Sequence, residues 1–302
     1  MITDRLIDRI IELQNPTCVG LDTLFDYLPE DMKRGAVTFD DAAERIFDFN
    51  KKLIDTLRDI VPSVKVQIAY YEMYGVAGMK AYEETLKYAA EKDLVVIADA
   101  KRNDIGSTAA CYAKTFLGST EVNGNAFKPF PSDYVTVNGY LGTDGIAPFV
   151  DQCEKNDKGI FVLVKTSNPS SGELQNLMLD NGKPVYEYMG GLVEKWGEST
   201  IGKYGYSAVG AVVGATHPTE AARLREVLPH TFFLIPGYGA QGANAEMLKS
   251  CFGKNGLGGV VNNSRGVLCA YQKLGGTYYE AARAACLTMQ KDLSSVIGPM
   301  AK

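Results

Sequence analysis

The chain has 302 residues, of which 46% are hydrophobic and 22% charged, and its formal net charge is −5. This composition is typical of a globular protein and gives no reason to expect nucleic acid or an anionic membrane as a partner. Any anionic ligand must therefore be held by a local group of positive charges.

The predicted elements begin with a charged, amphipathic segment at residues 1–11, which predicts a helix and not a secretory signal. Short apolar runs then alternate with longer helical patterns, and runs that are apolar throughout suit parallel strands buried on both faces. None reaches the roughly 20 residues that cross a bilayer. The expected strands are 17–21, 64–68, 94–98, 134–137, 160–164, 208–213, 231–235 and 259–261. Helices expected between them include 40–59, 81–92, 108–116 and 218–227.

Eight repeats of strand and helix predict a closed (β/α)8 TIM barrel, formed as a single domain over residues 1–302. An open doubly wound sheet is the alternative, and it is disfavoured because no G-x-G-x-x-G follows the first strand. Uneven spacing of the strands predicts exposed loop insertions at 25–38, 118–132 and 168–183. The helix expected at 218–227 should have Thr216 as its cap and Pro218 in its first turn.

The cysteines and histidines limit which metal sites and catalytic mechanisms can be expected. The six cysteines show no C-x-x-C spacing, so a zinc ribbon or a redox motif is not expected. Scattered through a chain without a secretory leader, they predict reduced, mostly buried thiols and a cytoplasmic location. Neither His217 nor His230 has a ligand-like neighbour, so the sequence predicts no metal site and no Ser-His-Asp mechanism.

The end of the third expected strand carries the most informative segment, Asp99-Ala-Lys101-Arg-Asn-Asp104. Active sites of such barrels lie at the mouth, where the strands have their C-terminal ends, and residues i and i+2 of a strand point to the same side. Asp99 and Lys101 should therefore both face the mouth. Asp104 follows where a helix begins, and Lys65 could reach the cluster from the neighbouring strand. Adjacent carboxylates would keep both lysines charged. The alternative is a purely structural set of salt bridges.

Two glycine-containing turns follow the last two strands, where this fold often binds phosphate. Glycines 237, 239 and 242 would let backbone N–H groups approach an anion closely. Arg265 offers a bidentate grip on phosphate oxygens, and Gln241 adds a neutral amide. Either turn alone could be ordinary turn chemistry, but two at adjacent strand ends favour a phosphate site.

Two further features of the mouth allow two interpretations each. Asp22, after the first strand, is either a cap or loop residue or an acceptor for sugar hydroxyls. The segment 166–172 is either an ordinary polar loop or one that closes over a ligand and excludes water.

Together these segments resemble the orotidine 5′-phosphate decarboxylase family. Asp99-Ala-Lys101-Arg-Asn-Asp104-Ile105-Gly is similar to its D-x-K-x-x-D-I signature. Five further segments resemble its other motifs in the same order, and the long loops resemble its longer bacterial branch. These segments are Leu21-Asp22, Val64-Lys65, Thr166-Ser-Asn-Pro169, Pro236-Gly-Tyr-Gly-Ala-Gln241-Gly and Ser264-Arg265-Gly.

The resemblance implies decarboxylation of orotidine 5′-phosphate to uridine 5′-phosphate, the last step of pyrimidine nucleotide synthesis, without a metal or an organic cofactor. Lys101 would donate a proton to C6 of the pyrimidine, and Asp99 would sit against the departing carboxylate. Lys65 and Asp104 complete the implied catalytic set. The implied substrate-binding residues are Asp22, Ile105, Thr108, Ser167, Pro236, Gln241 and Arg265.

The resemblance also assigns parts of the substrate. Lys65 and Asp22 would hold the ribose hydroxyls. Gln241 and Arg265 would bind phosphate, and Ser167 would contact the pyrimidine, although its neighbour Thr166 is an open alternative. A homodimer with shared active sites is implied, because Asp104, Ile105 and Thr108 would reach into the partner's site.

Two other functions compete with this prediction. A Mg²⁺-dependent sugar-phosphate decarboxylase or aldolase of the same superfamily would need a carboxylate at the end of strand two, where this chain has Lys65. A non-catalytic nucleotide-binding barrel would need the lysine and aspartate cluster to be structural.

Overall fold

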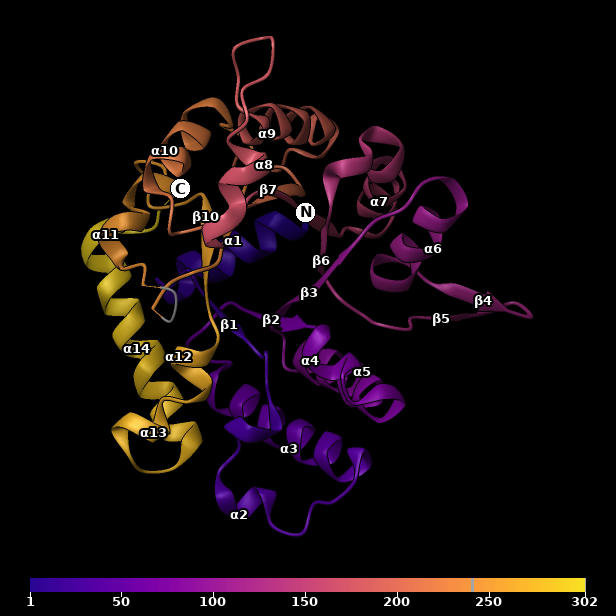
Figure 1. Cartoon of the computed structure of the whole chain (residues 1–302), viewed down its shortest axis with the longest axis vertical. Helices are drawn as coiled ribbons and strands as arrows, with labels where there is room; N and C mark the ends of the chain where they lie inside the picture. The colour runs from indigo at the N-terminus through magenta and orange to yellow at the C-terminus, as the bar shows by residue number, and fades with distance from the viewer. Residues whose placement is uncertain (240–241, 302) are drawn as a thin grey trace.

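The computed structural model describes residues 1–239 and 242–301. Eight parallel strands close into a barrel in the order β1-β10-β9-β8-β7-β6-β3-β2, which confirms the predicted fold (Figure 1). All eight predicted strands are present within a few residues of their expected ends. They are β1 (Thr17–Gly20), β2 (Ser63–Gln67), β3 (Val95–Arg102), β6 (Tyr134–Val137), β7 (Gly159–Lys165), β8 (Val209–Val213), β9 (Phe233–Ile235) and β10 (Gly259–Asn263).

Helices surround the barrel (Figure 1). The long ones are α1 (Ile2–Leu13), α3 (Phe39–Leu57), α5 (Gly75–Glu91), α6 (Gly106–Leu117), α7 (Thr143–Asn156), α9 (Val185–Trp196), α10 (Pro218–Val227) and α14 (Tyr278–Ile297). Short ones of four residues are α2 (Glu30–Lys33), α4 (Ala69–Glu72), α8 (Gly172–Gln175), α11 (Ala245–Leu248), α12 (Arg265–Leu268) and α13 (Tyr271–Leu274). Within the described residues, no helix combines the length and apolar character that crossing a bilayer requires.

The predicted N-terminal helix, α1 (Ile2–Leu13), closes the end of the barrel opposite the mouth. Its Thr3 hydroxyl lies 2.8 Å from the hydroxyl of Tyr134, at the start of β6, and donates to the carbonyl of Ser207 just before β8. The apolar stripe of α1 is buried against the strands. With this end sealed, the opposite end remains for a site.

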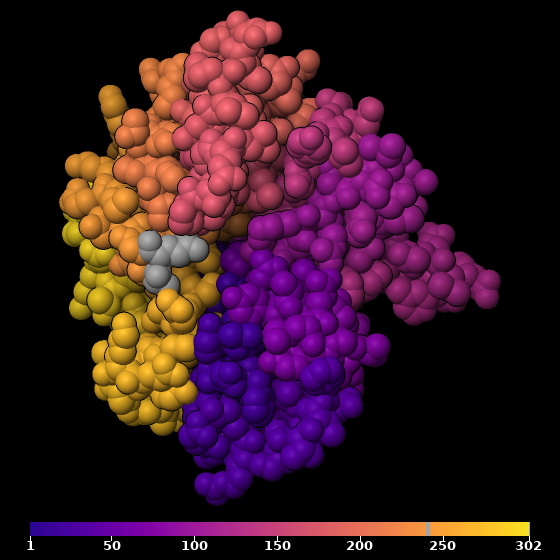
Figure 2. All heavy atoms as spheres, in the orientation of Figure 1, coloured from indigo at the N-terminus to yellow at the C-terminus, as the bar shows by residue number. Residues whose placement is uncertain are grey.

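Two local features differ from the prediction. The exposed insertion predicted at 118–132 is present, but it contains an unpredicted hairpin of β4 (Thr120–Val122) and β5 (Asn125–Phe127), which projects from the body of the molecule (Figures 1 and 2). Its two turn residues, Asn123 and Gly124, both have positive φ, 50° and 80°, as a two-residue hairpin turn requires. Thr216 does not cap α10, because its hydroxyl donates instead to the carbonyl of Ser167.

Candidate active site

A pocket of about 590 Å³ opens at the mouth of the barrel. Figure 2 shows a hollow near the middle of the molecular face, between the N-terminal part of the chain in indigo and the C-terminal part in orange. Residues in or just after all eight strands line it, which is how this fold builds a site from segments far apart in the sequence. Of the residues predicted for the site, the lining includes Asp22, Lys65, Asp99, Lys101, Ser167, Pro236 and Arg265.

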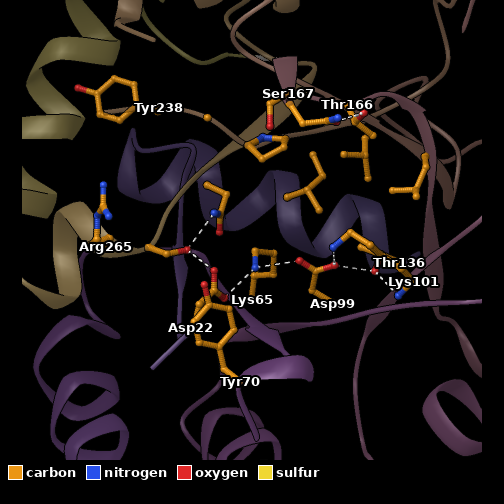
Figure 3. Close-up of a pocket in the computed structure, with 18 of the residues that line it drawn as sticks. Asp22, Lys65, Tyr70, Asp99, Lys101, Thr136, Thr166, Ser167, Tyr238 and Arg265 are labelled. Atoms are coloured by element: carbon orange, nitrogen blue, oxygen red, sulfur yellow. Dashed lines mark hydrogen bonds and ion pairs between the residues drawn. The ribbon is translucent and has the colours of Figure 1, made fainter. Parts of the chain in front are cut away.

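A row of alternating charges forms the floor of this pocket (Figure 3). The Lys65 ammonium lies 2.9 Å from Asp22 Oδ1 and 3.0 Å from Asp99 Oδ2. The Lys101 ammonium lies 2.6 Å from Asp99 Oδ1, the same oxygen to which the Thr136 hydroxyl donates at 2.8 Å. The predicted cluster therefore exists, and each charge in it is held by an opposite one.

Burial and neighbouring charges shift the pKa values of this row in opposite directions, and the effect of the charges is larger. Burial alone would raise the pKa of Asp99, but the ammonium groups of Lys65 and Lys101 outweigh it and hold the pKa of the carboxyl well below its usual range. Burial would lower the pKa of Lys65, but Asp22 and Asp99 hold it above its usual range. Both Asp99 and Lys65 are therefore charged at neutral pH.

The backbone at Lys101 is unusual. Its φ is +49°, in the left-handed region, and the pairing of β3 with β6 is irregular between Ala98 and Arg102. The Lys101 amide donates to the Thr136 hydroxyl at 2.9 Å, so Thr136 fixes both Lys101 and Asp99. A non-glycine residue in this region costs free energy, and such residues concentrate at functional sites. The predicted i, i+2 relation brings Asp99 and Lys101 together, but through a distorted strand end.

Asp22 is held from the opposite side by the last strand. The Ser264 hydroxyl donates to Asp22 Oδ2 at 2.6 Å and accepts from the amide of Asn262 at 3.2 Å. The contact needs a glycine in β1, because a Cβ added to Gly20 would lie 1.9 Å from Ser264 Oγ. Asp22 thus belongs to the hydrogen-bonded row, and the alternative of a helix cap is wrong.

Arg265 lies at one end of the row and Lys101 at the other (Figure 3). Arg265 is exposed, and among the described residues its guanidinium makes no ion pair. The glycine loop differs from the expectation, because the Gly239 and Gly242 amides donate to carbonyls of their own loop. Those two N–H groups are thus already engaged. Gln241, the other predicted phosphate ligand, lies outside the described residues.

The loop after β7 forms another wall of the pocket, and both Thr166 and Ser167 line it. The Thr166 hydroxyl is engaged: it donates to Asn168 Oδ1 at 2.7 Å and accepts from Gln175 Nε2 at 2.8 Å. Within the described residues, the Ser167 hydroxyl makes no such bond. Ser167 is therefore the residue with a free hydroxyl to offer a ligand.

Three predicted site residues do not line the pocket of their own chain: Asp104, Ile105 and Thr108. Ile105 is 56% exposed, and Thr108 is exposed on α6. The Asp104 carboxylate accepts from the Ile105 amide at 2.7 Å, just before α6 begins. All three lie on the surface beside the mouth.

Several lining residues were not predicted. Thr136 sits within the apolar run of β6, where threonine is an ordinary strand residue, and only the pairing with β3 reveals its role. Tyr70 follows β2 in a helical turn, where an aromatic residue would ordinarily signify packing. The remaining unpredicted lining residues are Tyr27, Leu163, Val212, Leu234, Tyr238, Asn262 and Ser264, whereas Asn168 and Gly237 belong to segments predicted for the mouth. In the described part of the chain, no three His, Cys, Asp or Glu side chains are grouped so that they could hold a metal ion.

Comparisons with known proteins extend over nearly the whole chain. The sequence profile of the Orotidine 5'-phosphate decarboxylase / HUMPS family matches residues 17–270. A Clostridium perfringens protein named orotidine 5'-phosphate decarboxylase is 42% identical over 299 residues, which cover 98% of this chain and 99% of the relative. The solved OMP decarboxylase of Leishmania donovani has a TM-score of 0.75 at 29% identity and covers 98% of both chains. A solved Toxoplasma gondii chain has a TM-score of 0.81 at 31% identity, covering 97% of this chain and 96% of that one.

Proposed function

The chain belongs to the orotidine 5′-phosphate decarboxylase / HUMPS family, as its motifs predicted, and from this membership we propose that it converts orotidine 5′-phosphate into uridine 5′-phosphate and CO2. It is then a carboxy-lyase of pyrimidine nucleotide synthesis. The observation that carries the proposal is the row Asp22–Lys65–Asp99–Lys101, which lies along a pocket with the free arginine, Arg265, at its far end.

Lys101 is the proposed proton donor. When the bond between C6 and the carboxylate carbon breaks, CO2 leaves and the electron pair stays on C6. The ring delocalises this sp² carbanion poorly, so the field of the protein must stabilise it. A fixed ammonium does so most strongly in the transition state, because the charge on C6 develops only then. The Lys101 proton then forms the new C6–H bond.

Asp99 is proposed to face the substrate carboxylate. Its low pKa keeps it ionised, so two negative charges meet in the bound substrate complex and separate as CO2 departs. Asp99 also fixes Lys101 and Lys65 before the substrate arrives, through contacts of 2.6 and 3.0 Å. This preorganisation avoids rearranging charges during the reaction.

The rest of the pocket is proposed to hold the nucleotide. Lys65 and Asp22 would bind ribose hydroxyls, and Ser167, with its free hydroxyl, would contact the pyrimidine. Phosphate would lie against Arg265 and beside Pro236, with Gln241 as a second phosphate ligand. Binding energy gained at this distant end helps to bring the charged carboxylate against Asp99.

The metal-dependent alternative is disfavoured by what stands at the end of β2. Lys65 is there, with its ammonium between Asp22 and Asp99, and a cation at this place would repel a divalent metal. The test is the loss of orotate ultraviolet absorbance when fresh protein meets orotidine 5′-phosphate, with and without a chelator. We expect turnover that the chelator leaves unchanged. No turnover would refute the proposal, and strong inhibition by the chelator would favour the metal-dependent alternative.

We further propose a cytoplasmic homodimer with shared sites, in which Asp104, Ile105 and Thr108 contact the substrate bound by the partner. Their place on the surface beside the mouth supports this. Mixing Lys101→Ala with Asp104→Asn tests it. Equal mixing should restore about a quarter of wild-type activity, because half of the dimers then hold one intact site. If the mixture is no more active than its components, the sites are not shared.

A further inference from the structure

A second lysine, Lys165, lies at the mouth but outside the row and outside the pocket lining. It is the last residue of β7, and its side chain is 0% exposed. Among the described residues, no carboxylate lies within ion-pair distance of its ammonium. The acceptors of its hydrogen bonds are neutral: Ser171 Oγ at 3.0 Å and Asn176 Oδ1 at 2.9 Å.

Both partners of Lys165 belong to one segment, residues 166–176, which we call the β7 loop. The start of this loop, at Thr166 and Ser167, is the wall of the pocket, whereas Ser171 and Asn176 lie further along it. Lys165 therefore ties the far part of the β7 loop back to the strand end from which the loop departs. The ammonium acts from behind the wall, without reaching the pocket itself.

Other contacts of the β7 loop converge on the same arrangement. The Thr166 amide donates to Gln175 Oε1 at 3.0 Å, which closes the loop on itself. From the start of α10, Thr216 donates to the carbonyl of Ser167 at 2.9 Å. His217 Nε2 lies 3.2 Å from the Ser171 hydroxyl that also accepts from Lys165. Among the described residues, this network holds Ser167 in place, and its one ammonium group belongs to Lys165.

Fold stability does not account for a lysine at this position. Burying an ammonium whose acceptors are neutral costs free energy that a methionine of similar length would not cost. An ammonium does offer three directed donors, and two of them set the path of the β7 loop. Lys165 therefore contributes by setting the position of the β7 loop and not by stabilising the fold.

We propose that Lys165 is a positioning residue for substrate binding: by tying Ser171 and Asn176 to the end of β7, it places Ser167 against the substrate. This rests on the proposed function of the pocket and adds to it a residue that touches no substrate. Lys101 and Asp99 do not depend on the β7 loop for their contacts. A change at Lys165 should therefore affect substrate binding more than the chemical step.

The test is steady-state kinetics of Lys165→Met with orotidine 5′-phosphate, together with thermal unfolding. We expect KM to rise roughly tenfold to a hundredfold, the range for losing hydrogen bonds to a buried charge, while kcat changes less than about threefold. Thermal stability should stay the same or increase. Lys165→Arg keeps a cation at this position, so its KM should lie between those of the wild type and Lys165→Met.

Lys158→Met is the matched control, because Lys158 precedes the opposite end of the same strand and pairs with Asp133 at 2.8 Å. It should leave KM unchanged. Ser171→Ala keeps the lysine and removes one acceptor, so it should raise KM less than Lys165→Met does, and it serves if that variant fails to fold. Unchanged KM in Lys165→Met, or in Ser171→Ala if only that variant folds, would overturn the inference while leaving the proposed function intact. Inactive wild-type protein would refute the proposed function itself.

Discussion

Two buried lysines at the mouth of the barrel have opposite surroundings. Lys65, 4% exposed, lies between two carboxylates, and although burial would lower its pKa, these carboxylates hold it above the usual range. Lys165, 0% exposed, has only neutral acceptors, and burial lowers its pKa, with only a weaker opposing effect from Glu220. The comparison teaches that a buried lysine can either belong to a row of alternating charges or hold a loop in place. The partners of its ammonium, charged or neutral, show which role it has. We call the row Asp22–Lys65–Asp99–Lys101 the charge array.

The largest expected effect is a loss of turnover when Lys101, the proposed proton donor of the charge array, is replaced. Lys101→Ala removes the proton donor and the stabilising charge, so turnover should fall roughly 1,000-fold or more, while the affinity for uridine 5′-phosphate changes little. Ultraviolet kinetics and calorimetric titration measure the two quantities. Lys158→Met, at the opposite end of the barrel, should keep wild-type turnover. A variant that loses affinity as steeply as turnover would contradict the assigned role.

Replacing each buried lysine with methionine compares the two regions directly. Lys65→Met leaves Asp22 and Asp99 facing each other without their cation, and we expect a loss of about 3–5 kcal/mol in the free energy of unfolding. Lys165→Met leaves no unpaired charge, so its change should be below about 1 kcal/mol. Denaturant unfolding at neutral pH measures both. Equal losses would mean that the partners of a buried lysine do not decide its contribution to stability.

Acid should affect the charge array through Asp99. Because the folded-state pKa of Asp99 is lowered, its contribution is fully present above the unfolded-state value of roughly 3.9 and is lost as pH falls toward the folded-state value. Wild-type stability should therefore decrease below about pH 4. Asp99→Asn should be less stable at neutral pH and should lose less in acid, which thermal unfolding from pH 2 to 7 would show. Parallel curves would refute this.

Like Lys165, Arg265 makes no ion pair with the described residues, but it is exposed, which leaves its guanidinium available to the proposed phosphate. Arg265→Ala should raise KM for orotidine 5′-phosphate roughly tenfold to a hundredfold. Its effect on kcat/KM for orotidine, which lacks the phosphate, should be much smaller. Equal effects on both substrates would remove Arg265 from the phosphate site.

The smallest expected effect tests a neutral member of the charge array. Thr136→Val keeps the shape of the side chain but removes the hydroxyl that bonds Asp99 and the Lys101 amide. Turnover should fall about tenfold, the usual range for one hydrogen bond. Thr56→Val, which removes a hydroxyl bonded only within its own helix, is the control and should leave turnover unchanged.

The barrel was predicted well because each strand is a short apolar run. Few other folds accommodate eight such strands that alternate with helices. The hairpin at 120–127 was missed, although Asn123-Gly124 is the usual signal for a two-residue turn. Its flanking strands are exposed, so they lack the apolar pattern that identified the others.

Within the site, residues with strong chemistry were predicted and those that only support them were not. Asp99, Lys101 and Lys65 are charged residues in apolar strands, which makes them conspicuous. Thr136 and Ser264 are common residues, and their partners lie 37 and 242 positions away. The positive φ of Lys101 could not be predicted either, because it occurs where the register between β3 and β6 shifts, which no local sequence pattern indicates.

The contact between Asp22 and Ser264 crosses the seam where β1 meets β10, the first and last strands of the barrel. A partly folded chain with this seam open has no complete site and cannot bind the nucleotide. Ligand would therefore stabilise the sealed ring alone, by about 2.7 kcal/mol at a hundredfold excess over Kd. In a cell with a high concentration of the nucleotide, bound nucleotide would therefore keep the barrel closed. Enzymatic activity would then indicate that β10 has paired with β1.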